Sequence, residues 1–359
     1  MTSAELAAAP AEFIGDDTFL GHPKGLAYLA FTEAWERFSY YGMSALLVLY
    51  MVNQLLLPGH VEHVAGFAAF RGTIEGAFGP LSTQALSSEI FGLYSGFVYF
   101  TPILGGWLGD RIGQRKAVIL GALSMSGGHL AMAFDESFLL ALLLLITGSG
   151  LLKGNISAQV GGLYPADDEE RRTRGFAIFS TGINFGALAG PLLCGLLAQH
   201  YGWHIGFGAA AFLMLVALAT YLSGYSSLPA RVERKTYAGA AMTKDDRKVV
   251  AAIFAALAIS VFPQIAYYQL SNVLPIWLEQ HADMAAGGFR VPIPWFQSID
   301  PFFSIISLPL LFSLWKWQGR ATGREPFELW KIAMGSFICG AANLILVAAI
   351  AAYGSGKVP

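Results

Sequence analysis

The chain has 359 residues, of which 55% are apolar and only 13% are charged, with a net charge of −2 and a mean hydropathy of +0.53. Soluble domains carry about 25% charged residues, so this composition excludes an ordinary water-soluble protein. The near-neutral net charge gives no indication of a nucleic-acid partner, and we expect none.

Long apolar blocks separated by short polar stretches follow one another along the chain. A helix needs about 20 apolar residues to cross ~30 Å of hydrocarbon, whereas a barrel strand alternates polar and apolar residues over about 10 positions. The sequence therefore predicts an all-α, polytopic membrane protein in contact with the lipid bilayer. Its nine predicted spans lie at 25–57, 90–108, 117–134, 138–163, 175–199, 204–222, 249–278, 295–315 and 327–353.

The lysine and arginine residues predict the orientation of these spans. The first twenty residues hold acidic residues and no lysine or arginine, unlike a secretory signal peptide. If the N-terminus is cytoplasmic, 17 of the 22 Lys and Arg residues fall in inner segments and three in outer segments. Positive charge gathers on the cytoplasmic side, so we expect a multi-pass protein of the inner (plasma) membrane with a cytoplasmic N-terminus.

A charged segment divides the predicted spans into two groups. We expect a cytoplasmic tail at 1–22, a six-helix N-terminal bundle at 23–223, a cytoplasmic linker at 224–248 and three helices of an incomplete C-terminal bundle at 249–359. A weak repeat, PILGGWLGDRIGQRK near the end of the second span and PLLFSLWKWQGRATGR near the end of the eighth, supports this division. Transporters built from parallel repeats show such a relation between their halves.

The first span carries ionisable residues that are costly in a membrane. Glu33, Glu36, Arg37, Tyr40 and Tyr41 are spaced so that they share one helical face. Each charge at mid-helix costs about 2.5–3.5 kcal/mol on an insertion scale, so the face must meet water or partners. An internal salt bridge is one interpretation. Two acids for one base leave a surplus carboxylate, however, which favours a proton-coupling site.

Three further positions carry candidate chemistry. Lys153, in the middle of the fourth span, would neutralise the spare acid of the first span or form a purely structural bridge. Asn184, in the fifth span, would bind a substrate amine or hydrogen-bond a neighbouring helix. Asp110 and Arg111, at the cytoplasmic end of the second span, are typical of a conformational latch. The two cysteines, Cys194 and Cys339, lie in apolar blocks, and we expect neither a disulfide nor a metal site.

These residues carry a resemblance to a known family. The loop Gly-x3-Asp110-Arg111-x-Gly-x-Arg-Lys resembles the loop motif of the major facilitator superfamily. The stretch Glu33-x2-Glu36-Arg37-Phe-x-Tyr40-Tyr41 resembles the first-helix motif of proton-dependent oligopeptide transporters. Lys153, the Ile-Asn184-x-Gly stretch and Trp-Phe-Gln-Ser before the eighth block are similar to that family in the same order.

The resemblance implies a major facilitator fold and proton-driven symport of di- and tripeptides by alternating access, with the proton as coupling ion, no cofactor and no enzymatic activity. It implies that Arg37 and Lys153 hold the peptide carboxylate while Glu33 and Glu36 exchange protons beside them. It also implies that Asn184 contacts the amino end or the backbone of the peptide. The other residues expected to line the pocket are Tyr40, Tyr41, Tyr99, Tyr268 and Asp300.

The sequence departs from the family pattern in three respects. Tyr268 stands where the family has an acidic residue, and Asp300 stands where it has Asn. One hypothesis is that Asp300 has taken over the proton role of the outer side; the alternative is that it lines the cavity without titrating. The family also has at least twelve spans, so we expect three further spans after Pro359 or from elsewhere.

Two other functions compete with peptide symport. The charged face would also suit a facilitator-type carrier of another small zwitterion or an anion. A non-transporting membrane protein that binds peptides is the second alternative. The sequence leaves the oligomeric state open.

Overall fold

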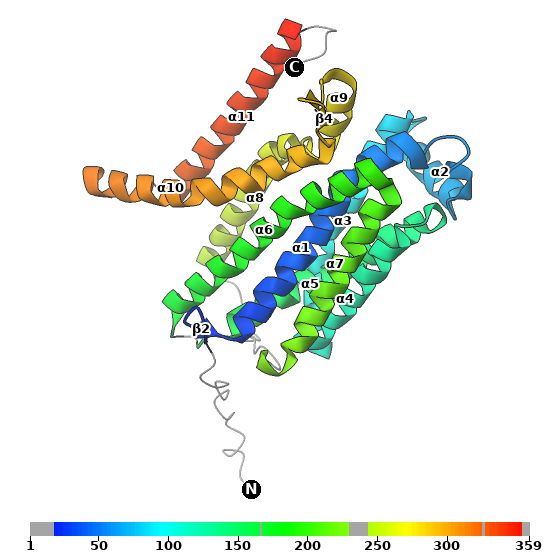
Figure 1. Ribbon diagram of the computed structural model, residues 1–359. Helices are drawn as coiled ribbons and strands as arrows, with labels where there is room; N and C mark the ends of the chain where they lie inside the picture. The colour runs from blue at the N-terminus through cyan, green and yellow to red at the C-terminus, as the bar shows by residue number, and fades with distance from the viewer. Residues whose placement is uncertain (1–17, 166, 230–242, 325–326, 354–359) are drawn as a thin grey trace.

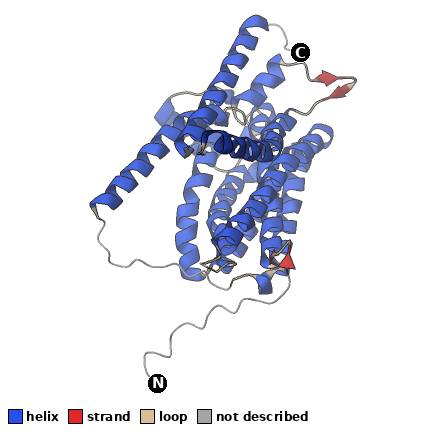
Figure 2. Ribbon diagram, turned by 90° about the vertical axis from the view of Figure 1, so that its left-hand side faces the viewer, coloured by secondary structure: helices blue, strands red, loops and turns tan. Residues whose placement is uncertain are grey.

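The structure, a computed structural model, describes residues 18–165, 167–229, 243–324 and 327–353. It is built almost entirely from helices (Figures 1 and 2), which confirms the all-α prediction. Parts of the expected tail and linker, residues 1–17 and 230–242, lie outside the described residues, as do 354–359.

Eleven helices and several short elements make up this part of the chain. The helices are α1 (Gly25–Tyr50), α2 (Phe67–Phe78), α3 (Thr83–Ile112), α4 (Gln114–Ala131), α5 (Phe138–Gly162), α6 (Glu169–Tyr201), α7 (Trp203–Ser223), α8 (Lys244–Tyr268), α9 (Val273–His281), α10 (Ile299–Thr322) and α11 (Glu328–Tyr353). A π-helical turn (Met51–Leu55) extends α1, and 3-10 turns lie at Val61–His63, Asp135–Ser137, Tyr225–Ser227 and Ile293–Ser298. Two antiparallel hairpins pair β1 (Thr18–Phe19) with β2 (His22–Pro23) and β3 (Ala285–Ala286) with β4 (Phe289–Arg290).

Local signals set several helix boundaries. The Ser82 side chain caps α3 by accepting a hydrogen bond from the Ala85 N–H at 3.2 Å, and Asp168 caps α6 in the same way through Arg171. At the other end, α3 stops at Gly113 and α6 at Gly202, each with a positive φ that glycine adopts at low cost. Thr243 and Asp246 form a reciprocal capping box at the start of α8.

Each of the nine predicted spans contains a helix, and two features differ from the prediction. The seventh block is interrupted rather than continuous, since α8 ends at Tyr268 and α9 begins at Val273. The structure also places α2 in the loop between the first and second spans, where no helix was predicted. Gly66 and Gly79, both with positive φ, bound this helix.

The first helix lies at the centre of a bundle formed with α3, α4, α5, α6 and α7 (Figure 1). Of its 26 residues, 21 are buried, so its charged side chains face protein rather than lipid. Glycines on α6 allow a close approach to α1. A Cβ on Gly186 would lie 2.8 Å from the Phe38 backbone nitrogen, and a Cβ on Gly182 would lie 2.8 Å from the Ala30 oxygen. Small residues at helix contacts are typical of membrane bundles.

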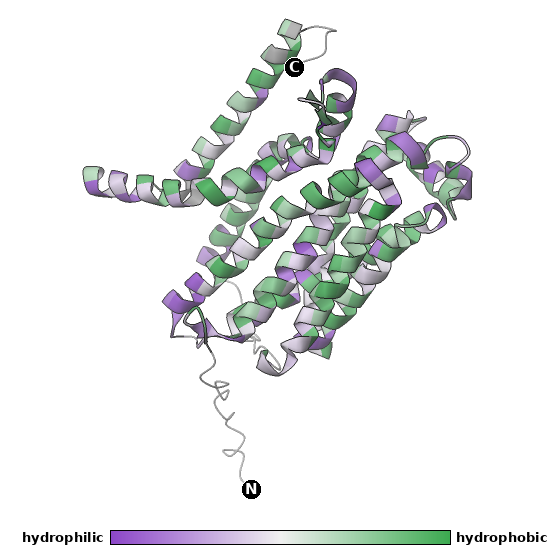
Figure 3. Cartoon of the chain, in the orientation of Figure 1, coloured by the Kyte–Doolittle hydropathy of each residue, from purple (hydrophilic) through white to green (hydrophobic). Residues whose placement is uncertain are grey.

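The helices α8, α10 and α11 are exposed along most of their length, and α10 and α11 extend away from the six-helix bundle (Figure 1). Many of their exposed residues are large and apolar, and Figure 3 shows apolar residues along all three helices. Six helical stretches in the described chain are long and apolar enough to cross a membrane. They are Asp135–Gly162, Glu169–Tyr201, Trp203–Ser223, Lys244–His281, Ile293–Thr322 and Trp330–Ala352.

Candidate functional site

A buried cluster of three charged side chains lies in the middle of α1. Glu33, Glu36 and Arg37 are 4%, 0% and 4% exposed. The Arg37 Nη2 donates to Glu36 Oε1 at 2.6 Å, and its Nε donates to the other oxygen of the same carboxylate. The Arg37 Nε also lies 3.3 Å from Glu33 Oε1. One guanidinium therefore serves two carboxylates, as the spacing in the sequence predicted.

One carboxylate oxygen of this cluster is left over. Glu33 Oε2 is buried and has no hydrogen-bond partner among the described residues. A buried polar atom without a partner is costly, and a proton or a ligand would remove that cost. This oxygen is therefore the point in the cluster with unused capacity to bind.

The ammonium of Lys153 lies beside the cluster but contacts aromatic rings. Its Nζ is 4.9 Å from the centre of the Tyr40 ring and 4.5 Å from that of Tyr99. The Arg37 guanidinium lies 5.0 Å from the same Tyr40 ring, so both cations contact Tyr40. Within the described residues, no ion pair joins Lys153 to Glu33 or Glu36, and its expected role in neutralising them stays a prediction. Cation–π contact stabilises the desolvated ammonium.

A row of tyrosines connects this cluster with the helices that follow the linker. The Tyr99 ring on α3 meets the Tyr268 ring on α8 at 6.2 Å, and Tyr268 meets Tyr267 at 6.0 Å. The Tyr267 hydroxyl donates to Asp300 Oδ2 on α10 at 2.9 Å. The structure thus brings the predicted residues Tyr99, Tyr268 and Asp300 into one continuous set of contacts with Lys153.

Two tyrosines of the site were not predicted. Tyr94 on α3 is buried and stacks on Tyr40 with ring centres 6.5 Å apart. Tyr267 is the direct partner of Asp300. The predicted Tyr41 packs edge-on against Tyr40, with ring centres 5.2 Å apart. Tyr94 lies five residues before Tyr99 on a predicted span, and only the tertiary packing shows that it reaches Tyr40.

Asn184 lies part-buried on α6, on the side away from α1. Gly182 and Gly186 face α1, and a residue midway between them in sequence points to the opposite side of the helix. Leu188, one turn further on, contacts the segment before α10, because its backbone oxygen accepts a hydrogen bond from Ser298 Oγ at 2.7 Å. Asn184 is therefore placed on the side of α6 that faces the later helices, where both of its predicted roles remain open.

The predicted latch residues lie at the C-terminal end of α3. Gln114 Nε2 donates to Asp110 Oδ1 at 3.4 Å, and the Arg111 guanidinium stacks over the Trp107 ring at 3.8 Å. Arg115, in the first turn of α4, donates to the backbone oxygens of Leu228 and Pro229. The start of α4 is thus tied to the segment after α7, and the latch role of Asp110 and Arg111 stays a prediction.

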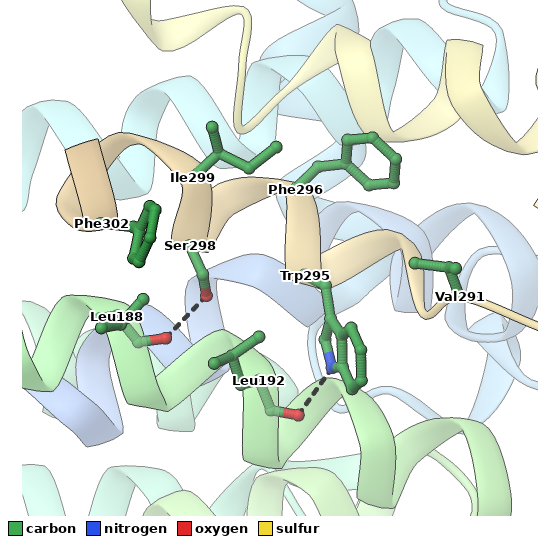
Figure 4. Close-up of a pocket in the computed structure, with 8 residues that line it drawn as sticks. All are labelled: Leu188, Leu192, Val291, Trp295, Phe296, Ser298, Ile299 and Phe302. Atoms are coloured by element: carbon green, nitrogen blue, oxygen red, sulfur yellow. Dashed lines mark hydrogen bonds between the residues drawn. The ribbon is translucent and has the colours of Figure 1, made fainter.

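A separate apolar pocket of about 350 Å³ lies between α6 and the start of α10 (Figure 4). Two of its polar groups are already satisfied, since Trp295 Nε1 donates to the Leu192 oxygen at 2.9 Å and Ser298 to the Leu188 oxygen. None of the predicted site residues lines it. Its lining residues are Leu188, Leu192, Val291, Trp295, Phe296, Ser298, Ile299 and Phe302.

Comparison with known proteins shows the family of the chain. The sequence model described as POT family matches residues 115–231 and 225–354. The chain belongs to the POT family. By family it is a multi-pass membrane transporter and not an enzyme. Its candidate site contains the first-helix motif on which the resemblance to this family was based.

Relatives and solved structures of the POT family match most of the chain. An uncharacterized transporter, YclF, of Bacillus subtilis (strain 168) is 31% identical over 92% of the chain and 74% of the relative. A di-/tripeptide transporter of Lactococcus lactis subsp. cremoris is 28% identical over 92% and 76%.

Among solved structures, a peptide transporter POT in complex with sulfate is 29% identical, covering 95% of this chain and 78% of that chain with a TM-score of 0.71. A POT family transporter in complex with 5-aminolevulinic acid is 26% identical, covering 96% and 80% with a TM-score of 0.72. These matches confirm the predicted transporter fold of the major facilitator type.

Proposed function

We propose that this chain carries di- and tripeptides across the inner membrane by proton-driven symport. The observation that carries the proposal is one buried guanidinium, Arg37, shared by two carboxylates and flanked by the ammonium of Lys153. A zwitterionic peptide presents a carboxylate that Arg37 and Lys153 attract. Its arrival would release Glu33 or Glu36 from Arg37 and so change which carboxylate holds a proton.

The proposed pocket is lined by aromatic rings and has an acid at its far side. Tyr40, Tyr41 and Tyr99 surround the cations, and Tyr268 leads towards Asp300. The two charges of a peptide backbone are separated by a similar span whatever its side chains, so recognition at the two ends admits many sequences. In this proposal Asn184 contacts the amino end or the backbone, Asp300 exchanges a proton on the outer side, and no cofactor takes part.

Hydrogen bonds between the earlier and later helices support alternating access. If the N-terminus is cytoplasmic, as the lysine and arginine distribution predicts, four contacts lie in the outer half of the molecule. Asn53 donates to both Glu279 oxygens at 2.9 and 3.0 Å. Gln199 donates to the Arg290 oxygen at 2.8 Å, and the other two are the Trp295 and Ser298 bonds to α6. This arrangement is that of an outer side held closed.

Uptake into liposomes tests the proposal. The full chain is reconstituted, and labelled dialanine uptake is measured with and without an inward proton gradient. We expect gradient-dependent uptake that unlabelled di- and tripeptides suppress and that single amino acids and nitrate do not. Lys153→Ala should abolish it, whereas Lys316→Ala, at an exposed lysine, should not.

Three results would contradict the proposal. Uptake that does not depend on the proton gradient would refute the proposed proton coupling. Full retention in Lys153→Ala would remove that residue from the mechanism, and intact pH-driven uptake in Asp300→Asn would show that Asp300 lines the cavity without titrating.

A second candidate is a carrier of other small zwitterions. It is favoured by the similar solved structure in complex with 5-aminolevulinic acid. Suppression of labelled dialanine uptake by that compound as strong as that by dipeptides would favour it, whereas dipeptide binding in detergent without flux would favour a peptide-binding protein.

A further inference from the structure

A second cluster of titratable side chains lies at the outer end of the six-helix bundle, where α1 ends. Its centre is the Asp135 carboxylate, between α4 and α5, whose side chain is 14% exposed. Asp135 Oδ1 accepts from the Tyr50 hydroxyl at 2.5 Å, and Oδ2 accepts from His60 Nδ1 at 2.9 Å. His204 Nε2, at the start of α7, lies 3.3 Å from Oδ1.

One nitrogen of this cluster lies between a hydrogen-bond donor and a hydrogen-bond acceptor. His204 Nε2 lies 3.3 Å from Asp135 Oδ1 and also 3.3 Å from Gln54 Nε2. The amide nitrogen is a donor and the carboxylate is an acceptor. Without a proton, Nε2 accepts from Gln54; with a proton, it donates to Asp135. The other ring nitrogen, Nδ1, is buried with no partner among the described residues, so no third group fixes the choice.

Gln54, one of the two partners of His204 Nε2, belongs to a short π-helical segment. Gln54 and Asn53 both lie in the π-helical turn Met51–Leu55, and π-helical turns are frequent at functional sites. Asn53 donates to both oxygens of Glu279 on α9. Holding Gln54 therefore holds the same turn that reaches across to the later helices on the outer side.

We propose that His204 is a proton-binding site at the outer face that controls closure of that face. Neutral His204 with its proton on Nδ1 accepts from Gln54 and keeps the π-helical turn in place, so Asn53 stays on Glu279. Protonated His204 pairs with Asp135 and releases Gln54, which loosens the turn and favours opening. Histidine is the side chain whose charge changes between about pH 5 and 8, so an acidic exterior would favour opening outwards.

Titratable groups of both signs lie on the elements around His204. Asp135 and its neighbour Glu136 lie on the segment before α5, and Glu62 lies in the outer loop, where its carboxylate accepts from the Gly59 N–H at 2.8 Å. Two other histidines, His60 and His63, lie in that loop, and when they are charged they repel a positive charge on His204. The Tyr50 hydroxyl is neutral. The inference rests on the proposed alternating access and not on the nature of the substrate.

Double electron–electron resonance (DEER), which measures the distance between two spin labels, tests this proposal without any substrate. The labels are placed at Leu57→Cys, just after the π-helical turn, and at Gln280→Cys, an exposed position next to Glu279. Cys339 is replaced by Ser, and Cys194 is fully buried. The full chain is measured in lipid nanodiscs at about pH 5.5 and about pH 8, on either side of the histidine range.

We expect the population with long distances to rise about fivefold at the lower pH, as the gain or loss of one neutral hydrogen bond would produce. His204→Gln should abolish this response, and His200→Gln, at an exposed histidine outside the cluster, should retain it. A parent chain with no pH response, or an equal response in His204→Gln, would overturn the proposal.

A second variant covers the case in which His204→Gln does not fold. Gln54→Leu removes the group that neutral His204 holds, so its long-distance population should be high at both pH values. A normal pH response in Gln54→Leu would also overturn the proposal. Because no peptide is present, these outcomes are independent of whether the chain transports peptides.

Discussion

Removing Arg37 alone should destabilise the chain, whereas removing all three charges of the α1 cluster should not. Arg37→Met leaves the Glu33 and Glu36 carboxylates, 4% and 0% exposed, without their common partner. Breaking a buried ion pair in this way costs about 3–5 kcal/mol. Domains of 150–250 residues lose roughly 2–4 °C of melting temperature per kcal/mol, so we expect a fall on the order of 10 °C.

The triple variant Glu33→Gln, Glu36→Gln, Arg37→Met keeps the side-chain volumes but carries no buried charge. Replacing a complete buried ion pair by groups of similar size is often neutral or stabilising by about 1–4 kcal/mol. The triple variant should therefore melt close to the parent chain or above it. Both variants should nevertheless lose proton-driven uptake, because the proposed binding groups are gone.

Thermal unfolding in detergent, followed by helical circular dichroism, measures the first effect, and liposome uptake measures the second. Arg37→Leu provides a repeat of the single substitution with a different apolar side chain. An Arg37→Met chain as stable as the parent would refute the reasoning about the buried charges. A triple variant that still transports would show that the cluster serves only to hold the bundle together.

Three further predictions concern other parts of the molecule. Gly186→Ala should cost about 1–3 kcal/mol by forcing α1 and α6 apart, whereas Gly208→Ala, which has open space around it, should cost nothing in the same melting assay. Tyr99→Leu should weaken peptide binding about 2- to 30-fold by removing the ring beside Lys153, and Tyr99→Phe should not. Burial and nearby arginines lower the pKa of His22, so its unfolded segment binds protons more readily. The hydrogen-exchange protection of the first hairpin, taken relative to the intrinsic exchange rate at each pH, should therefore fall as the pH falls below about 6.5, and not in His22→Gln.

The sequence allowed the spans and the centre of the site to be predicted, because both depend on local spacing. The costs of burying charge and the length of the hydrocarbon layer act on single helices, so α1 and its cluster of Glu33, Glu36 and Arg37 followed directly. The α2 helix was missed because it lies outside the membrane-length blocks. Its Phe67, Phe70 and Ile74, spaced as on one helical face, were a signal that could have shown it.

The remaining features depend on packing between distant segments. Tyr267 is the partner of Asp300, although its neighbour Tyr268 was the residue singled out in the sequence. The outer cluster joins residues 60, 135 and 204, and nothing in the sequence near any of them indicates the other two. Lys153 was expected beside the carboxylates, and only the folded structure shows the rings of Tyr40 and Tyr99 around its ammonium.

The two faces of α6 should give different signatures in a saturation mutagenesis screen. Gly182, Gly186 and Gly190 leave no room on the side of α1, so nearly every replacement there should be counter-selected regardless of polarity. On the opposite side, Leu188 and Leu192 border an open apolar pocket and should accept other aliphatic residues. A tolerance profile that repeats with the helical period along α6 would thus show which side of the helix is closely packed and which side has room for other side chains.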